Sequence, residues 1–229
     1  MGIRADYGLA SFDIRNVLHF SGGYQLPFGK GKKYMGDASG FMNQLAGGWS
    51  VNWSATLQGG QPIDLGCPTQ TSAGVACGAL LTGQPLDLGL HNDKNNVLNW
   101  FGNPGAFVQP CALDATLTPI PNSPPGCKPL SGLAALGGVT KVPGPGFHRL
   151  DFSIFKDFPI GEKRMLQFRT EIFNLTNHPN FNAPGFGGNG VVAISGAGNY
   201  NSSTFGEIGS TRDAPYDPRQ IQFALKFYY

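Results

Sequence analysis

The chain has 229 residues, and only 13% of them are charged, about half of the roughly 25% that is usual in a soluble globular protein. Because 41% are hydrophobic and 12% are aromatic, the composition excludes a solvated disordered chain. The formal net charge of +2 and the one short basic cluster, Lys30, Lys32 and Lys33, indicate no nucleic-acid partner. No apolar run of about 18 residues occurs, which excludes a membrane-spanning helix but not a membrane-spanning β-strand of about ten residues.

The start of the sequence lacks the basic segment and the apolar core of a secretory signal peptide. For an exported protein, this absence indicates a fragment of a longer chain. The second residue is glycine, but Asp6 stands where the myristoylation pattern requires Ser or Thr, so we expect no lipid anchor.

The first two predicted strands, residues 16–26 and 49–59, alternate strictly between apolar and uncharged polar side chains. Period-two alternation over about ten residues predicts an antiparallel strand that is long enough to cross an outer membrane. The apolar positions, which we expect to face lipid, are Leu18, Phe20, Tyr24, Trp49, Val51 and Trp53.

Three further predicted strands, residues 148–158, 164–174 and 219–229, alternate in the same way, with Phe155 as an exception on the polar side. Their polar positions include the pairs Arg149 with Asp151 and Arg169 with Glu171, which we interpret as ion pairs of a barrel lumen rather than as acid/base catalysts. The positions that we expect to face lipid are Leu150, Phe152, Ile154, Leu166, Phe168, Ile172, Ile221, Phe223, Leu225 and Phe227.

The connections predict an orientation, because outer-membrane barrels have short periplasmic turns and long extracellular loops. A tight turn at 159–163 joins the third and fourth strands, whereas 60–147 and 175–218 are predicted extracellular loops. Both loops are rich in Gly, Pro, Asn and Ser, which favour turns over regular elements. The connection 27–48 must then be periplasmic, and it is longer than is typical.

The four cysteines lie in the first long loop. Cys67 and Cys77 enclose one short stretch, and Cys111 and Cys127 enclose another. This spacing favours two local disulfides in an oxidising compartment over a metal site.

Nothing in the sequence predicts an enzyme, a cofactor or a metal centre. No Ser, His and Asp set has the context of a nucleophile elbow, and the glycine string at 185–190 lacks the strand and helix of a phosphate-binding loop. Asn177, His178 and Pro179 follow the fourth strand, where we expect a turn rather than a catalytic role. The histidines show no metal-ligand spacing: His19, His91, His148 and His178.

Soluble β-sandwiches also alternate, so a secreted adhesin or carbohydrate-binding module is an alternative. Sandwich strands usually have about five or six residues and a charged outer face, whereas these segments are about twice as long. Aromatic residues near the segment ends favour a barrel with girdles at two membrane interfaces. These residues are Tyr24, Trp49, Trp53, Phe158, Phe227 and Tyr229.

Several spaced motifs resemble the C-terminal barrel of the Oar-like TonB-dependent transporters, and together they cover nearly the whole chain except the cysteine-bearing loop. They are DIRNVLHFSGGYQLPFGKGKKY (13–34), LAGGWSVNWSATLQGGQPI (45–63), GPGFHRLDFSIFKDFPI (144–160), LQFRTEIFNLTNHPNF (166–181) and FGEIGSTRDAPYDPRQIQFALKFYY (205–229). The resemblance implies an all-β protein of the bacterial outer membrane, with a barrel of about 22 strands that encloses a plug. This chain would be an open fragment of that barrel, an antiparallel meander of long transmembrane strands.

The resemblance also implies a function and partners. This chain would supply the last strands of the wall of a substrate-uptake barrel, in contact with outer-membrane lipid. The TonB complex of the inner membrane would act through the missing N-terminal region, and Tyr229 resembles the terminal aromatic signal that the barrel-assembly machinery recognises. A porin-like passive channel, which lacks the plug, remains an alternative.

Overall fold

The chain forms two compact units, which we call the sheet unit and the loop unit. The sheet unit comprises Val17–Gln58, Phe147–Asn180 and Asp213–Tyr229, and the loop unit comprises Met1–Asn16, Gly59–Gly146 and Phe181–Arg212. The computed structural model describes residues 9–10, 12–70, 76–78, 80–92, 96–108, 140–184, 205–212 and 217–229.

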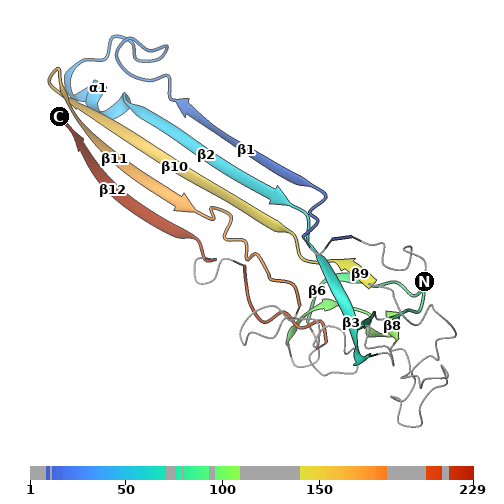
Figure 1. The fold of residues 1–229 in the computed structure, drawn as a ribbon. Helices are drawn as coiled ribbons and strands as arrows, with labels where there is room; N and C mark the ends of the chain where they lie inside the picture. Colours follow the sequence, from blue (N-terminus) through green and yellow to red (C-terminus); the bar gives the residue numbers. More distant parts are fainter. Residues whose placement is uncertain are drawn as a thin grey trace, which may run out of the picture. The chain divides into compact units, whose positions relative to one another are not determined.

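The sheet unit is one five-stranded sheet in the order β1-β2-β10-β11-β12 (Figure 1). All four neighbouring pairs are antiparallel, which confirms the predicted all-β antiparallel class. The five alternating segments of the sequence are these strands, and β10 extends further than the segment that we expected. The bounds are β1 Val17–Gln25, β2 Trp49–Gln58, β10 Phe147–Ile160, β11 Arg164–Phe173 and β12 Gln220–Tyr228.

The sheet has a turn end and a loop end. At the turn end, Gly161–Lys163 joins β10 to β11, the β1–β2 connection joins the first pair, and Tyr228 pairs with Met165 near the chain terminus. At the loop end, Gln58 pairs with Phe147, so the long connection between them leaves and returns at the same place. The short connections therefore alternate with the long ones, as a barrel wall requires.

The sheet is a single layer that does not close on itself. β1 and β12 are edge strands, and no closed barrel occurs within the residues that the structure describes. Among those residues, Ala55 is the one buried apolar side chain of the sheet unit. A β-sandwich requires a second layer over the apolar face, and no such layer is present in the described part of this unit.

A short helix, α1 (Gly40–Ala46), lies in the β1–β2 connection at the turn end (Figure 1). None of the helices in the described residues has the length and apolar character to cross a membrane.

The loop unit has regular structure and a core, although its sequence favours turns. Its strands form sheets of order β4-β3-β9, β5-β8 and β6-β7. The expectation of irregular loops was therefore wrong for the described part of 60–147, because short paired strands satisfy its backbone and bury an apolar cluster. The elements are β3 Pro62–Gln70, β4 Ala76–Gly78, β5 Leu80–Leu81, β6 Leu88–Asn92, β7 Leu98–Phe101, the 3-10 helix η2 Pro104–Ala106, β8 Phe107–Val108 and β9 Thr140–Pro143.

Three phenylalanines join the two long connections within this unit. The rings of Phe101, Phe107 and Phe205 lie with centroids 5.0–5.2 Å apart, and all three side chains are buried. The backbone of the second connection pairs with β7, since the Trp100 nitrogen donates to the Gly206 oxygen at 2.9 Å and the Ile208 nitrogen donates to the Leu98 oxygen at 2.9 Å. The connections 60–147 and 175–218 therefore share one core.

Cys67 lies in β3 and Cys77 in β4, and these antiparallel strands pair through Gly66 and Gly78. The proposed Cys67–Cys77 disulfide stays a prediction. Cys111 and Cys127 lie outside the described residues.

Candidate functional site: the two faces of the sheet

One face of the sheet is apolar along all five strands. Directly opposed residues of an antiparallel pair lie on the same face, and the register aligns Leu18 with Leu57, Phe152 with Trp53, and Phe168 with Leu225. All the residues that we expected to face lipid therefore share one face, and their contact with lipid stays a prediction. They are Leu18, Phe20, Tyr24, Trp49, Val51, Trp53, Leu150, Phe152, Ile154, Leu166, Phe168, Ile172, Ile221, Phe223, Leu225 and Phe227.

This apolar face is open to its surroundings. Phe223 and Leu225 each expose 67% of their surface, and Leu18 exposes 56%. A contiguous apolar surface of this kind is unfavourable in water and marks a membrane or partner interface.

An aromatic band crosses the apolar face at the turn end. It comprises Tyr24, Trp49, Phe158, Phe227 and Tyr229, and the rings of Phe227 and Tyr229 stack with centroids 6.3 Å apart.

Trp53 does not belong to this band, and the expected second girdle stays a prediction. Its register partners are Gly22 and Phe152, at mid-height in the sheet. Towards the loop end, the same face of the described strands carries Phe20, which is the next apolar position to Leu18, and Phe152, which lies directly opposite Ile172.

Lys156 is a charged residue on the apolar face, opposite Trp49 and Phe168. Its ammonium donates to the Gly47 oxygen at 2.6 Å and to the Asp157 oxygen at 3.1 Å. It also lies 4.3 Å from the ring centroid of Phe158. These hydrogen bonds and the cation–π contact offset the cost of holding a charge at an apolar position. Lys156 was not among the predicted site residues, although it interrupts the apolar alternation between Ile154 and Phe158.

The polar face divides into an uncharged half and a charged half. β1 and β2 contain no Asp, Glu, Lys or Arg, and His19 Nδ1 lies 2.8 Å from Thr56 Oγ1. The charged half lies on β10 to β12. There Arg149 Nε donates to Asp151 Oδ1 at 3.0 Å, as the predicted ion pair requires.

Arg169 does not pair with Glu171 as expected. Its Nε donates to Gln167 Oε1 at 2.5 Å, its Nη2 donates to Tyr228 Oη at 3.1 Å, and its guanidinium lies over the Phe155 ring at 5.2 Å. Gln167 in turn donates to Asp157 Oδ1 at 2.7 Å. A hydrogen-bonded row therefore crosses three strands on the polar face, and Phe155 belongs to it as a stacking surface.

Asn174, which was not among the predicted site residues, follows β11 at the loop end. Its backbone has φ +50, and its buried side chain donates to the oxygens of His178 at 3.0 Å and Asp217 at 2.6 Å. It also accepts from the His178 nitrogen at 3.1 Å. Asn177 Oδ1 accepts from the Arg219 nitrogen at 3.0 Å. The segment 174–178 is thus a turn that ties β11 to the start of β12, which agrees with the structural interpretation of Asn177 and His178.

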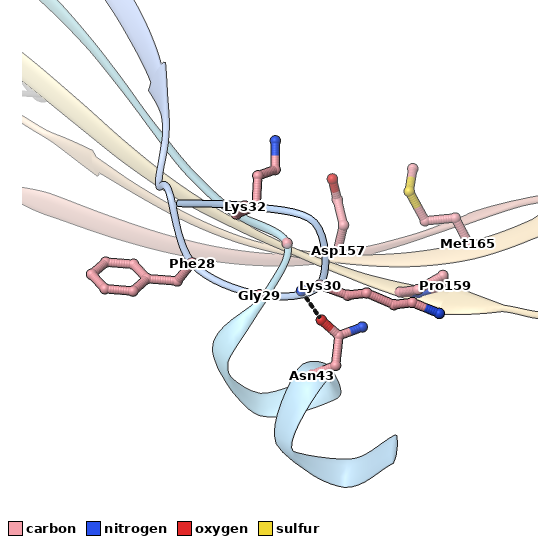
Figure 2. A pocket seen from close by; sticks show the side chains of 10 residues that line it. Phe28, Gly29, Lys30, Lys32, Asn43, Asp157, Pro159 and Met165 are labelled. Carbon is pink, nitrogen blue, oxygen red and sulfur yellow. Dashed lines mark hydrogen bonds between the residues drawn. The ribbon is translucent and has the colours of Figure 1, made fainter. Parts of the chain in front are cut away.

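A hollow of about 300 Å³ lies at the turn end, between the β1–β2 connection and β10 (Figure 2). Asn43 extends from α1 and accepts a hydrogen bond from the Lys30 nitrogen at 2.7 Å, which fixes the Gly29–Lys30 backbone beside the hollow (Figure 2). Lys32 and Asp157 line both this hollow and a smaller one of about 140 Å³ beside it.

The described residues contain no cluster of three or more His, Cys, Asp or Glu side chains that could hold a metal ion. The sheet offers two different surfaces: its apolar face suits contact with an apolar medium, and its polar face suits contact with polar groups.

A single-layer antiparallel sheet with one open apolar face, one hydrogen-bonded polar face and alternating short and long connections defines the class of membrane β-barrel proteins. The chain belongs to the outer membrane β-barrel domain family, which matches residues 2–222. The protein is therefore located in the bacterial outer membrane. No curated protein and no solved structure matches the chain.

Proposed function

We propose that this chain is the C-terminal part of the barrel wall of a TonB-dependent outer-membrane transporter. The observation that carries the proposal is the sorting of side chains by the register, with apolar groups on one face and the row Asp157, Gln167, Arg169 and Tyr228 on the other. A wall between lipid and a polar interior requires this sorting. The motifs that resemble the Oar-like transporters support the finer assignment.

The size of the two long connections also supports a receptor. They share the core around Phe101 and Phe205 instead of being separate short loops. In a transporter of this type, we expect the loop unit to lie on the extracellular side and to contribute to substrate capture. The sheet itself has a structural role, and we assign no catalytic step to it.

The partners follow from the same proposal. Outer-membrane lipid covers the apolar face, and the edges of β1 and β12 pair with other strands of the barrel, because unpaired backbone groups are costly in lipid. Tyr229, which directly follows β12 and is 98% exposed, is the group that the barrel-assembly machinery would recognise. The TonB complex would act through a plug region outside this sequence.

Planar-bilayer conductance of the full-length parent protein tests the transporter assignment. A plugged transporter gives little steady conductance, and mild urea that loosens the plug opens it. Steady conductance without urea, together with a reading frame that encodes no plug upstream, would instead establish the porin-like channel. A soluble β-sandwich does not agree with the outer-membrane location that follows from the family.

A further inference from the structure

The helix α1 exposes its apolar side chains and uses its polar ones to contact the protein. Phe41 exposes 78% of its surface, Leu45 58% and Met42 51%. By contrast, Asn43 accepts from the Lys30 nitrogen, and Gln44 Nε2 donates to the Pro159 oxygen at 3.3 Å. A helix on a water-facing surface has the opposite arrangement, with its apolar stripe against the protein.

The exposed side of α1 continues the apolar face of the sheet. Trp49, a member of the aromatic band, donates from Nε1 to the Leu45 oxygen at 3.0 Å. Lys156 donates from the same face to the Gly47 oxygen, directly after the helix. The end of α1 is thus fixed to the apolar face by two hydrogen bonds, and the helix lies at the turn end of the sheet (Figure 1).

The opposite side of the connection is polar. Lys30 and Lys32 line the turn-end hollow together with Asp157 (Figure 2), and Lys32 Nζ lies 3.4 Å from Gln25 Oε1 on the polar face. The connection therefore presents apolar groups towards the lipid side of the wall and cationic groups towards the lumen side.

We propose that α1 is an interfacial helix that inserts Phe41, Met42 and Leu45 among the acyl chains of phospholipids at the turn end of the barrel. Short helices with one apolar side lie in the headgroup and acyl-chain boundary of a bilayer, where aromatic belts also lie. Lipid is the occupant because this side of α1 is continuous with the apolar face, which lipid covers in the proposed function. The inference rests on the outer-membrane location and on the proposed lipid contact of the apolar face, and it does not require the TonB-dependent assignment.

Nitroxide labelling tests the proposal on the full-length parent protein in vesicles of phosphatidylethanolamine and phosphatidylglycerol. Single substitutions Phe41→Cys and Met42→Cys carry the label, and Asp37→Cys, an exposed position of the same connection, is the matched control. The protein without an added cysteine gives the background from the native ones. We expect the labels at 41 and 42 to collide more with oxygen than with a water-soluble nickel chelate, and we expect the reverse at 37.

Two results would overturn the proposal. Labels at 41 and 42 that prefer the nickel chelate would place α1 in water. Labels that are protected from both reagents would show that a protein surface or a second copy covers the helix. Labelling at two positions separates a local distortion from a change in the environment of the whole helix.

Discussion

Gly22 lies directly opposite Trp53 in the β1–β2 ladder, and the indole ring covers the glycine so closely that a Cβ at position 22 would lie 2.6 Å from Trp53 Cζ2. The glycine thus provides the space that lets a large aromatic side chain lie flat across two strands at mid-height of the wall.

We expect Gly22→Ala to destabilise the folded barrel by about 1–3 kcal/mol, because the methyl group displaces the indole ring. The free energy of unfolding in detergent, from denaturant titration of the full-length parent, measures the effect. Gly59→Ala is the matched control, since a Cβ there would meet only the Asn16 oxygen at 3.8 Å. Trp53→Leu should restore part of the loss in the double variant, and an equal loss with or without the indole would contradict the steric explanation.

Lys156→Met should loosen the β1–β2 connection. The Gly47 oxygen loses its donor at 2.6 Å, and an unsatisfied buried carbonyl costs about 1–3 kcal/mol. We expect faster tryptic cleavage after Lys30, Lys32 or Lys33 in the folded parent protein, followed by mass spectrometry. Lys163→Met, at an exposed turn position, should leave the rate unchanged. Unaltered cleavage in the Lys156 variant would mean that other contacts hold the connection.

Asn174→Ala should destabilise the junction between β11 and β12. The change removes the hydrogen bonds to His178 and Asp217 and places alanine at φ +50, a conformation that asparagine tolerates better because its side chain can hydrogen-bond locally. Asn174→Gly separates the two effects, because glycine tolerates this φ. We expect faster hydrogen exchange of the first β12 amides in both variants. Full protection of these amides in both variants would contradict the role of Asn174 in holding the start of β12 to β11.

Cys67 and Cys77 lie on paired antiparallel strands, each next to a member of the Gly66–Gly78 pair, and we predict that they form a local disulfide. Peptide mapping of the non-reduced parent protein should recover the two cysteines in one linked fragment that reduction separates. Free thiols at both positions, detected by alkylation before reduction, would remove this prediction.

The sequence predicted the sheet because alternation is local and strict. In β2, Trp49, Val51 and Trp53 alternate with Ser50 and Asn52, and one register slip would move every side chain to the other face. The loop unit was missed for the opposite reason. Phe101, Phe107 and Phe205 are separated by turns and by a long stretch of chain, so no periodic pattern indicates that they meet.

The details of the candidate site depended on cross-strand neighbours, which a single sequence does not reveal. Arg169 was expected to pair with Glu171, two positions away on the same strand, but it contacts Tyr228 on β12 and Phe155 on β10. Lys156 broke the alternation visibly, yet its partner is the backbone of Gly47, which belongs to a distant connection. Only the register and the folded connection bring these groups together.

The sorting of the two faces is tested most directly by a pair of arginine substitutions at adjacent positions of β12. Phe223 lies on the apolar face opposite Thr170, and Gln222 lies on the polar face opposite Glu171. We expect Phe223→Arg to lower the free energy of unfolding of the full-length parent in lipid vesicles by about 2–4 kcal/mol, as for an arginine near the bilayer midplane. Gln222→Arg should change it little. Equal losses at the two positions, or a larger loss at Gln222, would contradict the assignment of the apolar face to lipid.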